Sequence, residues 1–268
     1  MRATAGENYR IQTKTTRIMS KLIVRLFKEK SLIAEASNIQ LEYIATTTFR
    51  IFYLEDVTFV KNDLTLYRNH HVEILIYFLD DKLENDRQVV GGFDITLRLI
   101  NDQFLSNFTQ KNEGLLKLEG AVSSETDYSQ GEINVYKSWQ IGKEINWWDL
   151  PFDISILDYI MVCLKYSTIS SIKPKKELVK IDFKNIKSEL AFSCAFAEEY
   201  LGKRAYMGRY LDTFQDCLLT LYDSDNKYFD NVTVILIYKE LNLNDTMCKI
   251  IVEVIEILNK FKFNIIEE

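Results

Sequence analysis

The chain has 268 residues, a formal net charge of −6 at pH 7 and a sequence pI near 5.2. Hydrophobic residues make up 47% and charged residues 27%, which is typical of a globular protein long enough for two domains. The acidic balance argues against nucleic-acid binding, which depends on positive patches, and it fits a basic protein partner.

The cysteines and the hydropathy pattern together predict a cytoplasmic protein without a membrane partner. Cys163, Cys194, Cys217 and Cys248 are far apart, none lies in a Cys-x-x-Cys pair, and each falls in an apolar run. We therefore expect four buried, reduced thiols. No apolar run approaches the roughly 18 residues that span a bilayer, and residues 1–20 lack the apolar core of a signal peptide.

Residues 1–20 are polar and without periodicity, which predicts a flexible lead, with Met19 as an alternative start. From residue 21 to 166 a period of two dominates, most clearly from Phe93 to Leu99. Such alternation indicates half-buried antiparallel strands, so we expect a β-rich domain built as a sandwich or a bent sheet. The expected strands are 22–26, 39–44, 49–53, 72–78, 93–99, 115–122, 133–139 and 160–166, and a short helix is expected at 102–111.

Residues 167–176 are small, polar and basic and include Pro174, which predicts a linker. Beyond it the periodicity changes, and alternating strands and helices predict right-handed crossovers and a small parallel sheet. The predicted fold class is α+β overall, with the β-rich domain followed at 177–268 by a small α/β domain that has a three-stranded parallel sheet. Its expected strands are 178–183, 232–238 and 263–266, its expected helices contain Leu190–Leu201 and Leu211–Leu221, and a last helix begins at Asn244 or Asp245. The apolar run at 232–238 predicts a central strand buried on both faces.

The segment from Tyr206 to Leu218 stands out within this second domain. Its apolar stripe at helical spacing consists of Leu211, Phe214, Leu218 and Leu221. Asp212 and Asp216 lie one turn apart and off that stripe, so they should be exposed although like charges at this spacing repel each other. Gly208, just before the helix, suits a turn with unusual backbone angles.

This segment resembles the signature of the barstar family, the proteinaceous ribonuclease inhibitors. The matching positions are Tyr206, Gly208, Leu211, Asp212, Asp216, Cys217 and Leu218. The order of strands and helices from residue 178 to 268 also fits that family. Met207, Tyr210 and Gln215 depart from the signature, since a second aromatic residue, Asn and Trp are common there.

The resemblance implies that the two matching carboxylates enter a nuclease active site and mimic substrate phosphates, with the tyrosine packing beside them. A rigid helix with two carboxylates can offer charge-assisted hydrogen bonds to clustered cations without being cleaved. The partner-binding residues expected on this basis are Tyr206, Gly208, Leu211, Asp212, Gln215 and Asp216. Residues 176–268 carry a net charge of −4, from 12 Lys and Arg against 16 Asp and Glu, which suits a basic partner.

The sequence therefore predicts an immunity protein that inhibits a basic toxin enzyme, a ribonuclease, and that is not itself an enzyme. We expect no catalytic residues, no cofactor and no metal. Two alternatives remain: an interaction module that does not inhibit, and an enzyme with its site in the β-rich domain. The second is weakened because His70 and His71 are adjacent, and neighbours on an extended chain point to opposite faces. Trp147 and Trp148 predict either an exposed recognition loop or packing in the core or between the domains.

Overall fold

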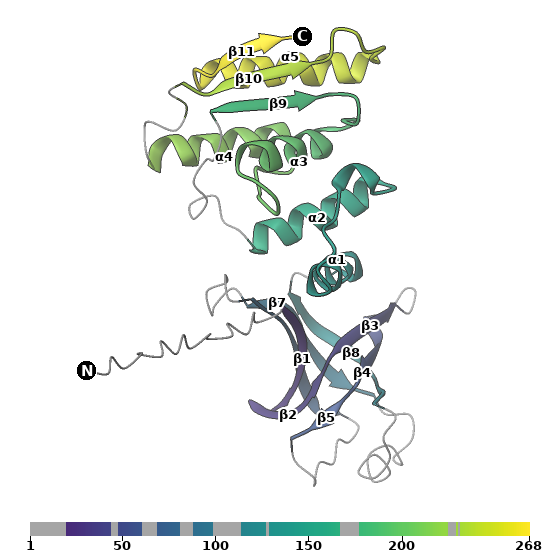
Figure 1. Cartoon of the computed structure of the whole chain (residues 1–268). Coiled ribbons are helices and arrows are strands. Elements are labelled where there is room, and N and C mark those ends of the chain that lie inside the picture. The colour runs from purple at the N-terminus through teal and green to yellow at the C-terminus, as the bar shows by residue number, and fades with distance from the viewer. Residues whose placement is uncertain are drawn as a thin grey trace, which may run out of the picture.

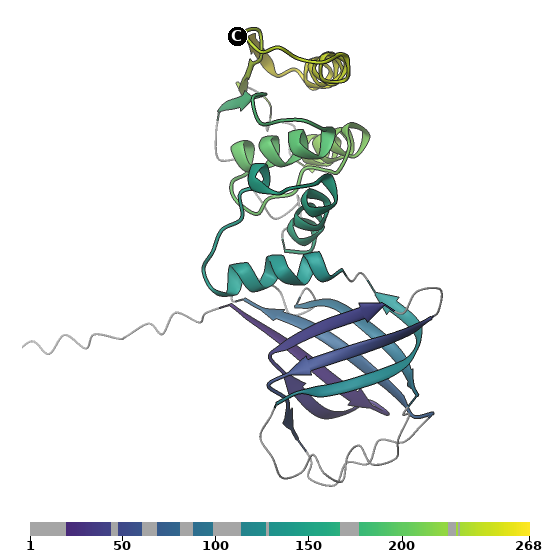
Figure 2. The same ribbon diagram turned by 90° about the vertical axis from the view of Figure 1, so that its right-hand side faces the viewer.

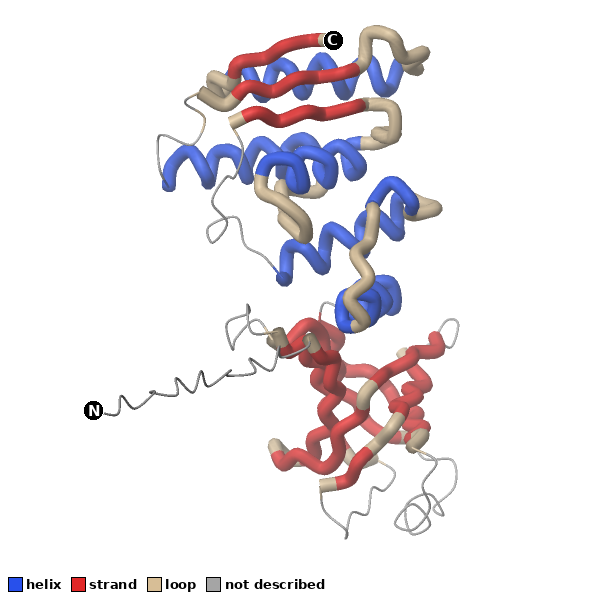
Figure 3. Tube along the Cα trace, viewed as in Figure 1, coloured by secondary structure: helices blue, strands red, loops and turns tan. Residues whose placement is uncertain are grey.

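The computed structural model describes residues 20–43, 48–60, 69–80, 88–98, 114–126, 129–166, 177–224, 229 and 231–268. Within these ranges the chain forms two sheets with a helical segment between them (Figures 1 and 3). The expected lead with Met19, the helix at 102–111 and the linker at 167–176 lie outside the described residues.

The larger sheet has eight antiparallel strands in the order β3-β4-β8-β7-β6-β1-β2-β5 and is strongly curled (Figure 2). Its strands are β1 (Lys21–Lys28), β2 (Ser31–Ala36), β3 (Asn38–Tyr43), β4 (Phe49–Glu55), β5 (Thr58–Phe59), β6 (His71–Leu79), β7 (Val89–Leu97) and β8 (Leu116–Thr126). Only Ser37 separates β2, which lies next to the edge strand β5, from β3, the edge strand at the opposite end of the sheet order. Of the two expected arrangements, the structure has the bent sheet and not the sandwich.

The core of the curled sheet follows the predicted alternation. In β6, Val72, Ile74, Ile76 and Phe78 are buried, whereas the residues between them are only partly covered. Strand pairing places this row between β1 and β7, so the same face of the neighbouring strands closes around it. The period of two therefore identified the buried face of this sheet correctly.

Two segments predicted as strands are helical. Residues 133–139 lie in α1 (Gln130–Gln140), and residues 160–166 lie in α2 (Asp153–Tyr166). A short 3-10 turn, η2 (Trp147–Asp149), lies between them. The prediction of β structure up to residue 166 was therefore wrong for its last quarter, and the helical segment begins at Gln130.

Capping and spacing explain why α1 is a helix. The Ser129 hydroxyl accepts a hydrogen bond from the Glu132 N–H at 2.9 Å, which satisfies one of the free donors of the first turn. Ile133, Tyr136 and Trp139 then follow at intervals of three and are buried on one side. An interval of three matches a helix and conflicts with a strand, whose side chains change face at every residue.

The helical segment contacts the curled sheet on one side and a helix beside the smaller sheet on the other. Toward the curled sheet, the Tyr136 ring packs on Phe78 with ring centroids 4.7 Å apart, and Gln140 Oε1 accepts a hydrogen bond from the Leu22 N–H at 3.1 Å. On the other side, the Tyr159 hydroxyl donates to Glu198 Oε1 on α3 (Glu189–Tyr200) at 2.8 Å, and α3 in turn packs on the smaller sheet. α1 and α2 therefore link the curled sheet to α3 through side-chain contacts.

The smaller sheet is parallel and three-stranded, as predicted, in the order β11-β10-β9. Its strands are β9 (Leu178–Asp182), β10 (Thr233–Ile237) and β11 (Asn264–Glu267), and its helices are α3 (Glu189–Tyr200), α4 (Leu211–Ser224) and α5 (Asp245–Lys260). Of the two residues expected to begin this helix, Asn244 is the N-cap of α5, because its Oδ1 accepts from the Met247 N–H at 2.9 Å.

The helices of this part cover only one face of the parallel sheet. The crossovers from β9 to β10 and from β10 to β11 both step in the same direction, so right-handed connections place α3, α4 and α5 on the same side (Figure 2). Val234 and Leu236 point into that core, whereas Leu178 and Ile266 are exposed on the other face. The centre of β10 is nevertheless buried on both faces, as predicted, because Ile235, which points to the face without helices, is also buried.

Candidate functional site

The loop before α4 turns sharply at Gly208. Its φ is +92°, and a Cβ atom at this position would lie 2.4 Å from the Phe214 backbone nitrogen. The turn is held by Thr213, whose Oγ1 accepts hydrogen bonds from the Arg209 and Tyr210 N–H groups at 2.8 and 2.9 Å. The Leu211 N–H donates to Glu189 Oε2 on α3 at 3.0 Å, which ties the start of α4 to its neighbour. The first turn of α4 is thus fixed in position by local and tertiary contacts.

The two candidate carboxylates lie on the outer face of α4. Asp212 and Asp216 are both exposed, as their position off the apolar stripe predicted. Asp212 Oδ1 accepts from the Thr213 N–H at 2.5 Å, a contact that also suits a negative charge near a helix N-terminus. The Asp216 side chain makes no hydrogen bond to another described residue. Its carboxylate is therefore available to a partner.

Apolar side chains flank these carboxylates. Tyr210 is 47% exposed at the N-terminal end of α4, and Leu219 is 48% exposed one turn beyond Asp216. Gln215 lies beside them and is half-buried. Sequence reasoning did not single out Leu219, although its spacing of seven residues from Asp212 already places it on the same face. The outer face of α4 is thus acidic in its centre and apolar at both ends.

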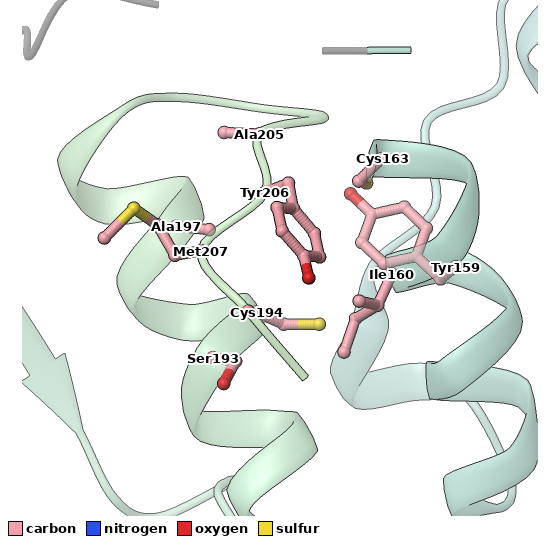
Figure 4. Close-up of a pocket in the computed structure, with 10 residues that line it drawn as sticks. Tyr159, Ile160, Cys163, Ser193, Cys194, Ala197, Ala205, Tyr206 and Met207 are labelled. Carbon is pink, nitrogen blue, oxygen red and sulfur yellow. The ribbon is translucent and has the colours of Figure 1, made fainter. Parts of the chain in front are cut away.

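The other expected contact residues are turned inward. Leu211 is buried in the core, and Gly208 is covered by the backbone of α4. Tyr206 is half-buried in a narrow crevice between α2 and α3, where its ring faces Tyr159 and Ile160 (Figure 4). Burial raises the pKa of the Tyr206 hydroxyl above its usual value. The structure therefore brings Asp212, Gln215 and Asp216 together at the surface and places the other three behind them.

The crevice around Tyr206 also contains two thiols. Cys163 on α2 and Cys194 on α3 line it, are buried and are not in a disulfide. Burial raises the pKa of both thiols, which keeps them protonated and weakly nucleophilic. Cys217 is also free and buried, whereas Cys248 is exposed, so the expectation of four buried thiols was wrong for Cys248.

Arg204 anchors the same loop to the helical segment. Its φ is +64°, and its guanidinium lies 4.4 Å from the centre of the Trp139 ring and 5.5 Å from that of Tyr166. Nη2 and Nε donate to the two carboxylate oxygens of Glu144 at 2.5 and 3.2 Å. An arginine held by a paired carboxylate and two aromatic faces is strongly restrained, which a lysine could not reproduce.

Elsewhere in the β-rich part and the helical segment, the polar residues engage one another. His71 Nε2 lies 3.9 Å from Asp94 Oδ1 at an exposed position. A groove of about 410 Å³ between α1 and α2 contains Asp149 and Asp158. Asp149 accepts from Asn146 at 3.0 Å and stabilises a local turn, whereas Asp158 on α2 accepts from Ser129, the N-cap of α1, at 2.7 Å and joins the two helices.

The tryptophan pair divides between core and surface. Trp147 is buried, and Trp148 packs against it edge to face while remaining partly exposed. Lys203 Nζ lies 5.1 Å from the centre of the Trp148 ring. The pair therefore contributes both to the core and to a contact with the loop before α4.

Comparison with known proteins gives no relative: no family model, no curated protein and no solved structure matches this chain. Among the described residues, no group of three or more His, Cys, Asp or Glu side chains is placed to hold a metal ion. In the same part of the chain, every helix is too short or too polar to cross a membrane.

Proposed function

We propose that this chain is a cytoplasmic immunity protein that binds and inhibits a basic toxin enzyme, a ribonuclease, with the outer face of α4. The observation that carries the proposal is the pair of exposed carboxylates, Asp212 and Asp216, held one turn apart on a helix whose start is fixed by Thr213 and Glu189. The order strand, two helices, strand, helix, strand around a parallel sheet supports the barstar-like interpretation.

The chemistry of such a surface suits a phosphodiester-binding site. Clustered cations in a nuclease would receive charge-assisted hydrogen bonds from both carboxylates, and complementary potentials would speed the encounter. Because Asp216 has no internal partner among the described residues, binding would not first have to break an intramolecular hydrogen bond. Tyr210 and Leu219 would add apolar contacts at the two ends of the acidic stretch.

The test is inhibition of RNA cleavage by a panel of basic ribonucleases, with the chain and its variants. Asp212→Asn/Asp216→Asn should fold normally, because both sites are exposed. Each lost charge pair in a desolvated site costs roughly 2–5 kcal/mol, so Kd should rise by at least about thirtyfold.

The matched control is Glu253→Gln/Glu256→Gln on α5, which removes the same charge from another exposed helix face. It should leave inhibition intact apart from a small, salt-dependent change. Full inhibition by the Asp212/Asp216 double variant would contradict the phosphate-mimic mechanism.

One observation favours a second candidate, an interaction module that binds a basic protein without inhibiting it. Tyr206, which the barstar-like mechanism would place against the nuclease, lies in the crevice against α2. In that case the native chain would bind a basic partner without slowing RNA cleavage. The Asp212/Asp216 double variant would lose that binding.

A further inference from the structure

The contact between the helical segment and the loop at residues 201–210 has the features of a latch. At one end, Arg204 is clamped by Glu144, Trp139 and Tyr166, and its side chain is only 16% exposed. At the other end, Arg209 Nη1 lies 4.0 Å from Met161 Sδ on α2. Between these two points, the Tyr206 ring is half-buried between α2 and α3 (Figure 4).

The same contact leaves polar atoms unsatisfied. Trp139 Nε1, Ser193 Oγ and Arg209 Nε are buried and have no hydrogen-bond partner within the described part of the chain. Ser193 lines the crevice that holds Tyr206, and that crevice has no room for a water molecule. A buried donor without a partner carries a free-energy cost that is relieved when water or another partner reaches it. The contact between the helical segment and the loop is therefore stabilised by a few side chains, such as Arg204, and destabilised by these unpaired polar atoms.

We infer that α1 and α2 form an intramolecular cover over the loop at residues 201–210, latched by Arg204, which withholds Tyr206 from a partner until the cover opens. The consequence for a partner rests on the proposed function, whereas the latch itself can be tested on the protein alone. In the closed state a partner can contact only the outer face of α4. When α1 and α2 move away from the loop, the Tyr206 ring also becomes accessible to the partner.

The experiment compares Arg204→Ala with Arg25→Ala in the full chain. Arg25 is a matched control, because it also pairs with a carboxylate, that of Glu35 at 2.8 Å, and stacks on an aromatic ring, that of Tyr77 at 4.8 Å. Its contacts lie on the curled sheet, away from the cover. Hydrogen exchange followed by mass spectrometry reports the opening of residues 201–210, and nitration by tetranitromethane reports the accessibility of Tyr206.

In Arg204→Ala we expect amide exchange in residues 201–210 to rise by roughly tenfold or more, and Tyr206 to become reactive, while β10 stays protected. Arg204→Lys keeps the charge but loses the planar guanidinium, so its exchange rate and Tyr206 reactivity should lie between those of Arg204→Ala and the unmodified chain. Arg25→Ala should match the unmodified chain in both measurements. If Arg204→Ala destabilises the whole protein, β10 will exchange faster too, and Glu144→Gln then serves as the milder variant.

Unchanged exchange and unchanged Tyr206 reactivity in Arg204→Ala and Glu144→Gln would overturn the latch, whatever the partner is. If a ribonuclease is inhibited, opening should also raise its association rate, because less of the protein is in the closed state. Faster exchange together with slower association would show that the closed loop is the binding form, which would overturn the withholding of Tyr206. If the proposed function is wrong, inhibition of ribonucleases will be unchanged in Asp212→Asn/Asp216→Asn. That result is independent of the hydrogen-exchange test of the latch.

Discussion

Replacing Gly208 by alanine should destabilise the protein much more than the same change at Gly142. Both glycines have positive φ, +92° and +75°, so both substitutions force an alanine into a left-handed conformation. A Cβ at Gly208 would lie 2.6 Å from the Thr213 carbonyl carbon and 2.8 Å from Phe214 Cα, whereas a Cβ at Gly142 meets nothing within 4 Å. The comparison thus isolates the clash with the α4 backbone.

The magnitude follows from three terms. A left-handed conformation costs an L-residue roughly 1–2 kcal/mol, and the reduced entropy of the unfolded chain offsets about 0.4–1 kcal/mol of this. Overpacking against backbone that must shift adds roughly 1–3 kcal/mol. Gly142→Ala should therefore cost about 0–1.6 kcal/mol, and Gly208→Ala should cost about 1–4.6 kcal/mol, so the clash adds roughly 1–3 kcal/mol to the difference.

Urea unfolding followed by circular dichroism measures both costs, provided that the m value is unchanged between the variants. Equal midpoints for the two variants would refute the argument, because they would mean that the loop can move away from α4 without cost. A lower m value for Gly208→Ala would indicate partial unfolding of the native state, and the comparison would then be made by hydrogen exchange at α4.

Two further predictions concern titratable groups. Cys248 is exposed and should be alkylated by iodoacetamide in the native protein at about pH 8. Cys217 should react only after unfolding, because burial raises the pKa of its thiol to about 12. Equal labelling of the two cysteines in a mass spectrum of the native protein would contradict this prediction. A hydrogen bond from its hydroxyl to Glu267 raises the pKa of Tyr238 to about 12 from a value of about 10 in the unfolded chain. Because the folded-state pKa is the higher one, this stabilisation is complete below pH 10 and is lost as the pH rises to 12. Tyr238→Phe should therefore lower the urea midpoint of unfolding at pH 9. Between pH 10 and pH 12 the free energy of unfolding of this variant should fall less than that of the unmodified chain. Parallel pH profiles for the two proteins would refute this prediction.

The strands that could be predicted from the sequence are those with one face against the core and the other toward solvent, because their side chains alternate between apolar and polar. In β6 the alternation from Val72 to Phe78 reports directly which side chains face the core. Helix α1 was missed because residues 133–139 contain apolar residues at spacings that satisfy both periods. The signal that decides for a helix was nevertheless present, since Ser129 and Glu132 have the spacing of a capping box.

The exposed part of the candidate site could also be predicted, since Asp212 and Asp216 lie off an apolar stripe that only a buried helix face explains. The inward position of Tyr206 could not be predicted, because it depends on α2, which is distant in sequence and was expected to be a strand. The position of all three helices on one side of the parallel sheet could not be read from the sequence either. A run such as Val232–Tyr238 reports hydrophobicity, whereas the side on which helices lie depends on the direction of two crossovers.

The charges of the loop before α4 show how the cover and the acidic face depend on each other. Lys203, Arg204 and Arg209 place three positive charges in the loop directly before α4, and unpaired charges there would weaken the attraction for a basic partner. Lys203 Nζ lies 2.6 Å from Glu198, and Arg204 is paired with Glu144 on the helical segment. These pairs neutralise two of the three cations, so the potential in front of α4 is set mainly by its own carboxylates. The helical segment thus acts on this region in two ways: α2 packs against the Tyr206 ring, and Glu144 neutralises Arg204, while Glu198 on α3 neutralises Lys203.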